Sequence, residues 1–77
     1  MSYVDEVANE LAALALADEE RSGDDKIVAQ VSEILGASSQ TLQESFLTFV
    51  RVRRAEVRAR EMLGARARAQ SADGAGA

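Results

Sequence analysis

Glycine and proline usage constrains the fold of this chain more than any other feature of its sequence. Proline is absent, and glycines before the C-terminal tail stand only at positions 23, 36 and 64. Proline breaks helices and glycine weakens them, whereas alanine, leucine, arginine and glutamate are strong helix formers. The sequence therefore predicts an all-α protein whose helices are separated at these glycines.

Apolar residues recur at helical spacing in each of the three segments. A first helix is expected over residues 3–20, with Ser2 as its N-cap and an apolar face of Val4, Val7, Ala8, Leu11, Leu14 and Ala15. Its alanines Ala8, Ala12 and Ala15 would let another helix approach closely. Residues 21–25 are polar and predict a turn. A second helix is expected from Ile27 to Gly36, a favourable left-handed terminator, and a third from about residue 39 to about residue 63, capped by Ser38 or Ser39.

These helices are expected to form a small antiparallel bundle of three helices, with residues 1–63 as a single helical domain. At 1.5 Å per residue the third helix would be roughly 40 Å long and the first about 27 Å, so the third overhangs its neighbours. If the second and third helices were continuous through Gly36, the chain would be a two-helix hairpin that dimerises into a four-helix bundle. Residues 64–77 lack bulky apolar side chains, which predicts a frayed or disordered tail.

The chain has little capacity to stabilise itself, and its charge is strongly polarised. It has 77 residues and no cysteine, so it has a small core and neither disulfides nor thiolate-bound metal to reinforce it. Residues 1–25 hold eight acidic side chains against Arg21, whereas residues 51–68 hold seven arginines against Glu56 and Glu61. We therefore expect association with a second copy or with a charged partner.

The C-terminal half of the third helix carries the residues predicted to mediate association. One broad face mixes apolar and charged side chains at steps that allow arginine–glutamate pairs: Val52, Arg53, Glu56, Val57, Arg60 and Leu63. It is either a solvated surface with weak ion pairs or a homodimer seam in which the charges set the register. In the second case the exposed length of the third helix pairs with the first or the third helix of the other copy. A basic stripe of Arg51, Arg54 and Arg58 lies on the other side, either solvated or docked on an acidic protein surface.

Residues 31–42 resemble the turn of a bacterial helix-turn-helix DNA-binding motif. The resemblance rests on a small residue at 32, apolar residues at 31, 35 and 42, and glycine at 36. It implies a small DNA-binding regulator using residues 31–44, with base contacts from Ser38, Ser39, Gln40, Gln43 and Glu44. Ser45 departs from the usual aliphatic residue, and the arginines that could neutralise phosphates lie two to five turns further along. A helix end followed by a serine cap accounts for the same residues.

Catalytic chemistry is not expected. Histidine and cysteine are absent, so the commonest general base, nucleophile and zinc ligands are missing, and no glycine-rich phosphate loop is present. We expect a non-enzymatic assembly, adaptor or regulatory protein without a cofactor or metal, acting through helix faces. The N-terminus lacks the pattern of a signal peptide and no apolar run is long enough to cross a bilayer, so a cytoplasmic location without membrane association is expected.

Overall fold

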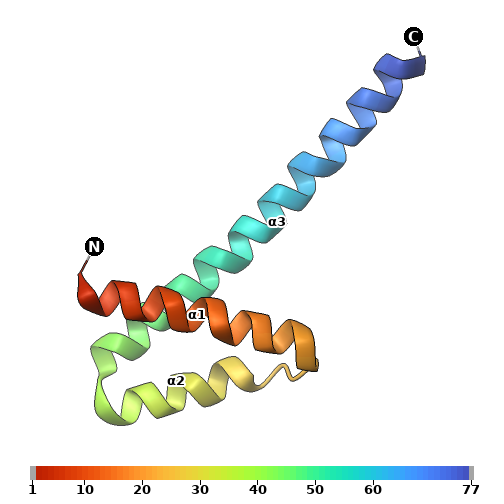
Figure 1. Ribbon diagram of the computed structural model, residues 1–77. Helices are drawn as coiled ribbons and strands as arrows, with labels where there is room; N and C mark the ends of the chain where they lie inside the picture. Colours follow the sequence, from red (N-terminus) through yellow and green to blue (C-terminus); the bar gives the residue numbers. More distant parts are fainter. Residues whose placement is uncertain (1, 77) are drawn as a thin grey trace.

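The computed structural model describes the backbone of residues 2–76 and the side chains of residues 2–71. Within that range the chain forms three helices: α1 (Tyr3–Ser22), α2 (Ile27–Ser38) and α3 (Gln40–Gly76). Figure 1 shows α1 and α2 running in opposite directions as a hairpin, while α3 crosses α1 and then projects far beyond it. The predicted all-α bundle with a long third helix is confirmed.

Capping interactions fix both ends of α1 close to the predicted positions. The Oγ of Ser2 accepts a hydrogen bond from the backbone N–H of Asp5 at 3.2 Å. At the other end Gly23 has a left-handed backbone with φ of 76°, and its N–H donates to the carbonyl of Glu19 at 2.8 Å. A left-handed residue turns the chain out of a helix at little cost only when it has no Cβ. Gly23 therefore sets the turn that leads into α2.

The predicted left-handed terminator at Gly36 is wrong. Among the described residues only Gly23 has a positive φ, and α2 continues through Gly36 to Ser38. The chain turns instead at Ser39, an extended residue whose Oγ accepts a hydrogen bond from the N–H of Leu42 at 3.1 Å. Because Ser39 can end one helix and cap the next, α2 and α3 are separate helices joined by one residue.

The helix α3 also differs from its predicted length. It continues through Gly64 to Gly76, although the sequence predicts an end near residue 63. A single glycine inside a helix costs only about 1 kcal/mol relative to alanine, and residues 65–70 consist of alanine, arginine and glutamine. No sequence signal is therefore strong enough to stop the helix at Gly64. Fraying of this segment in solution stays a prediction.

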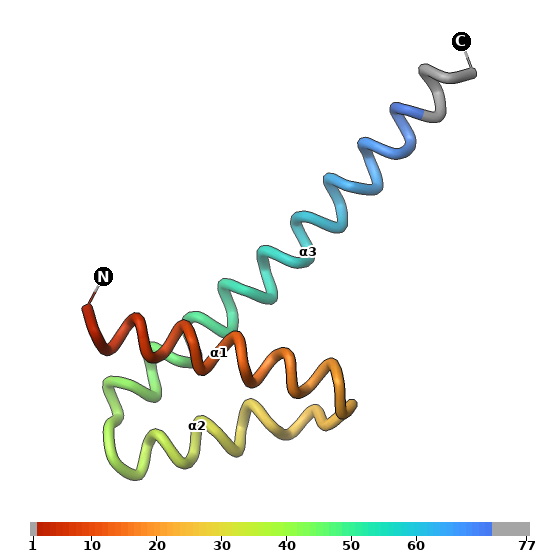
Figure 2. Tube along the Cα trace, viewed as in Figure 1, coloured from red at the N-terminus to blue at the C-terminus, as the bar shows by residue number. Residues whose placement is uncertain are grey.

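The molecule is flat and elongated. Its principal-axis extents are 59 × 30 × 13 Å, and its Cα radius of gyration is 16.9 Å. A compact chain of this length would have a radius of about 11.5 Å. The tube in Figure 2 shows that the elongation comes from the part of α3 beyond α1. The short dimension corresponds to only two packed helices, so each helix keeps one side towards solvent.

Candidate functional site

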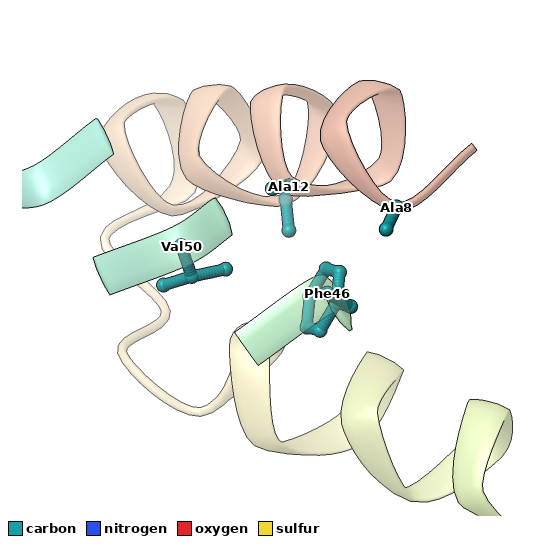
Figure 3. Packing of buried hydrophobic residues seen from close by; sticks show 5 residues of the cluster. Ala8, Ala12, Phe46 and Val50 are labelled. Carbon is teal, nitrogen blue, oxygen red and sulfur yellow. The ribbon is translucent and has the colours of Figure 1, made fainter. Parts of the chain in front are cut away.

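The crossing of α1 and α3 holds the centre of the small core. Three alanines at steps of four and three residues, Ala8, Ala12 and Ala15, form a buried seam along α1. Figure 3 shows Ala8 and Ala12 directed towards Phe46 and Val50 of α3, which are also buried. The alanine side chains are small, so they leave space between the two helices, and the single large ring of Phe46 fills it. This contact fixes the direction in which α3 leaves the body of the protein.

Three polar contacts flank the alanine seam and join the same two helices. The Oγ of Ser45 donates to Asp5 at 2.9 Å, and the Nε of Arg53 donates to the Oδ1 of Asn9 at 3.0 Å. Further along α1, Arg54 and Glu19 form an ion pair at 3.0 Å. The part of α3 that contacts α1 thus extends from Ser45 to Arg54. Arg53 and Arg54, predicted for a dimer seam and a basic stripe, are both engaged by α1 of their own chain.

The contact between α2 and α3 is closer than the sequence suggests. The Nε2 of Gln43 donates to the backbone carbonyl of Ser32 at 2.9 Å, and Ser32 is buried. The same carboxamide lies over Gly36, where an added Cβ would collide with Nε2 and would lie 2.7 Å from the Cδ of Gln43. Gly36 therefore leaves room for the carboxamide of Gln43 and does not form a turn.

This packing bears directly on the resemblance to a helix-turn-helix motif. Such a motif joins its helices by a turn of three or four residues that often contains glycine. Here one residue, Ser39, separates the helices, and Gly36 lies inside α2. Gln43, one of the residues expected to contact bases, is bound to Ser32 instead. Of the other expected base contacts, Ser38, Gln40 and Glu44 are exposed and Ser39 is half-buried, and DNA binding stays a prediction.

Beyond Arg54, α3 continues as an arm, defined here as residues 55–71. Every residue of the arm is exposed except Gly64, which is half-buried. The Nε of Arg60 donates to Glu56 at 2.9 Å, so the predicted pairing along the helix is present. Large apolar side chains nevertheless face solvent: Val57 is 53%, Met62 is 56% and Leu63 is 60% exposed. The arm is therefore an uncovered surface rather than part of the single-chain core.

The structure separates the nine residues predicted to mediate association. Exposed on α3 are Val52, Glu56, Val57, Arg60 and Leu63, whereas Arg53 is half-buried against α1. At 100° per residue Val57 and Leu63 lie about 120° apart around α3, so a single partner helix lying along α3 cannot cover both. Of the basic stripe, Arg51 and Arg58 are exposed and Arg54 is paired with Glu19. These positions alone do not test whether a partner binds there.

A second stripe that faces away from the core lies on α1 and was missed by the sequence interpretation. It is here called the α1 outer stripe, and its residues are exposed except for the half-buried Val7: Tyr3, Val7, Glu10, Leu14, Ala17 and Arg21. Tyr3 is 78% and Leu14 is 60% exposed, so the prediction that Leu14 belongs to the core face is wrong. Ala8, Ala12 and Ala15 are the buried residues of α1, with Leu11 and Leu16 partly buried beside them, whereas Leu14 faces solvent. Alternating steps of four and three residues were the available signal.

The described residues form neither a metal-ligand cluster nor a pocket. Among them no group of three or more histidine, cysteine, aspartate or glutamate side chains is placed to hold a metal ion. No pocket is found, and every buried side-chain nitrogen or oxygen atom has a hydrogen-bond partner within the part of the chain described. None of the helices described combines the length and apolar character that a membrane span requires. No family model, curated protein or solved structure matches the chain.

Proposed function

We propose that this chain is a non-enzymatic helical interaction protein, with an assembly, adaptor or regulatory role, that self-associates through the exposed length of α3. The observation that carries the proposal is the arm, which extends away from the body and exposes Val57, Met62 and Leu63. An exposed surface of this kind is costly for a lone chain, because apolar area remains in water. Contact with a second copy removes that cost.

The accessible surface of the chain supports an association of ordinary size. The chain exposes 5694 Å² and has a mass of 8.2 kDa. A folded monomer of that mass is expected to expose about 4,500 Å². The difference of about 1,200 Å² exceeds the roughly 800 Å² that each partner buries in a standard protein–protein interface. Covering the arm would therefore bring the exposed surface towards that of a typical compact protein.

The small core supports the same proposal. The buried apolar side chains of the described part are three alanines, Phe46 and Val50. Burying an alanine methyl contributes far less than burying a leucine or phenylalanine side chain. Without disulfides to reinforce it, such a core gives a narrow margin of stability. A partner that binds only the folded chain raises that margin by mass action.

The remaining basic residues supply a place for a second partner. Arg51 and Arg58 are exposed on a side of α3 that points away from Leu63, and they make no ion pair in the part of the chain described. Guanidinium groups bind carboxylates with two parallel hydrogen bonds. We propose that this side of α3 docks on the acidic surface of another protein once the chain has self-associated.

The mass of the protein in solution tests self-association. Light scattering coupled to size exclusion should give twice 8.2 kDa at tens of micromolar protein. Leu63→Glu should return the mass towards that of one chain, because a buried carboxylate without a partner costs several kcal/mol.

Ala65→Glu is the matched control for this substitution. Ala65 is exposed and lies about 200° from Leu63 around the helix, so it adds the same charge on the opposite side. The control should keep the wild-type mass, and circular dichroism should show that both variants remain helical. A wild-type mass of one chain at all concentrations would refute self-association. Equal masses for the two variants would refute the assignment of Leu63.

A further inference from the structure

The arm and the body of the chain carry opposite charges. Residues 1–54 hold ten acidic side chains against five basic ones, a net charge of −5. The arm, residues 55–71, holds four arginines against Glu56 and Glu61, a net charge of +2. Two arms packed against each other would bring like charges together, which is unfavourable over a long interface. An arm packed on the body of another copy brings opposite charges together.

The exposed part of α3, the arm together with Val52, also offers a stripe that matches the α1 outer stripe in spacing. It is called the α3 outer stripe, and its residues recur at alternating steps of four and three and are all exposed: Val52, Glu56, Ala59, Leu63, Arg66 and Gln70. Alternating steps of this kind place residues along one side of a helix that can pack lengthwise against another helix. Each stripe has a leucine at its fourth position and carries one acidic and one basic side chain.

The two stripes agree in length as well. Tyr3 to Arg21 and Val52 to Gln70 each cover eighteen helical steps, about 27 Å at 1.5 Å per residue. The helix α1 carries six acidic side chains against Arg21, a net charge of −5, whereas α3 from Val52 to Gln70 carries six arginines against two glutamates, a net charge of +4. Length, spacing and charge therefore all suit a lengthwise contact between these two surfaces.

A chain cannot make this contact with itself. The alanine seam of α1 is packed on α3 of the same chain, around Phe46 and Val50. The α1 outer stripe lies on the other side of α1, since Leu14 is about 200° from Ala12 around the helix. Figure 1 shows the arm leaving the crossing in a straight line away from the body, without turning back over α1. A second molecule must supply the arm that covers the stripe.

We infer that two copies exchange arms, so that the α3 outer stripe of each lies along the α1 outer stripe of the other. The inference rests on the self-association proposed above and names what the arm binds. Two identical contacts related by a twofold axis close the assembly as a dimer. Each α1 is then covered by its own α3 on the alanine side and by the partner's arm on the outer side. Leu14 and Leu63, both 60% exposed in one chain, become buried in the same interface.

Cysteine cross-linking tests this arrangement directly, because the natural chain has no cysteine. Leu14→Cys and a differently tagged Leu63→Cys are mixed at equal concentration and oxidised under dilute conditions. Each variant has one thiol, so every disulfide joins two molecules. A disulfide requires Cα atoms within about 7 Å, so the mixed dimer should form several-fold faster than either variant paired with itself. Ala65→Cys in place of Leu63→Cys should remove this preference.

The same samples separate failure of the inference from failure of the proposed function. A dimeric mass together with fastest self-linking of Leu63→Cys would overturn arm exchange in favour of arm–arm packing, while self-association would stand. A mass above that of a dimer would overturn the closed twofold arrangement. A monomeric mass with slow cross-linking throughout would overturn both.

Salt gives a second readout that uses the unmodified protein. Contact between the basic arm and the acidic body should weaken as sodium chloride rises from about 0.05 to 0.5 M, because screening reduces attraction between exposed opposite charges. The dimer dissociation constant should rise several-fold over this range. Packing of two basic arms would respond in the opposite direction, with a dissociation constant that falls, and that result would overturn arm exchange.

Discussion

Substitution of Gly36 by alanine probes the contact between α2 and α3 and also decides what this glycine does. In an open helix, replacing glycine by alanine stabilises the fold by about 1 kcal/mol. At Gly36 the new Cβ would collide with the carboxamide of Gln43, whose Nε2 donates to the Ser32 carbonyl at 2.9 Å. Moving that flexible side chain loses a hydrogen bond worth about 1 kcal/mol. The two effects oppose each other at similar size.

Gly36→Ala in the natural background should therefore leave the free energy of unfolding within about 1 kcal/mol of the wild-type value. In a Gln43→Ala background the three atoms nearest the added Cβ are removed, so the same substitution should stabilise by about 1 kcal/mol. The difference between the two backgrounds, a coupling energy of about 1 kcal/mol, measures the contact. Urea unfolding followed by the helical circular dichroism signal measures all four proteins at one fixed protein concentration.

Two results would refute this reasoning. Equal effects of Gly36→Ala in both backgrounds would mean that Gln43 does not lie over Gly36. Destabilisation by more than about 1 kcal/mol in both backgrounds would mean that Gly36 has a left-handed backbone, since alanine is strained there. That second result would restore the turn on which the resemblance to a helix-turn-helix motif depends.

Three further predictions concern the body of the protein, each measured as a change in urea unfolding. Ala12→Leu should destabilise by about 1–3 kcal/mol by overpacking the buried seam, whereas Ala29→Leu at an exposed position of α2 should change stability by under about 0.5 kcal/mol; equal effects would contradict the seam. Gly23→Ala should cost about 1 kcal/mol through backbone strain alone, because its φ is 76° and no atom lies within 4 Å of the added Cβ; no loss would contradict the left-handed cap. Glu19→Gln should cost under about 1 kcal/mol by breaking the partly exposed pair with Arg54, and less at high salt; a cost that grows with salt would contradict the pairing.

Much of the fold follows from local sequence preferences. The absence of proline, the cap at Ser2 and the left-handed break at Gly23 place α1 and the first turn within two residues of their observed bounds. These are short-range effects, in which each side chain acts on its own backbone and the next few residues. The prediction at Gly36 is wrong because glycine suits two situations: a left-handed helix end, and a place where a neighbouring helix occupies the space of a Cβ. Its role depends on Gln43, seven residues along and on another helix.

The candidate interaction surface was predicted less completely, because it also depends on contacts between different helices. The exposure of Glu56, Val57 and Leu63 on α3 agrees with the overhang expected from helix length. Residue spacing did not predict that Arg53 and Arg54 contact α1 instead of facing solvent. Those contacts depend on where Asn9 and Glu19 lie after α1 packs. Alternating steps of four and three residues marked the α1 outer stripe in the sequence, but only the inward-facing alanine seam shows that this stripe is left uncovered. Leucine is more hydrophobic than alanine, so hydrophobicity alone gives the wrong inner face for α1.

The sequence by itself determined that the chain is helical, where its first turn lies, and that its charge separates into an acidic body and a basic arm. Those properties depend on composition and on neighbours within a few residues. Only the tertiary structure decided which side of each helix is covered, because close approach of two backbones favours Ala8 and Ala12 over larger side chains. That choice leaves Leu14 and the arm uncovered, and it is the reason to look for a second copy.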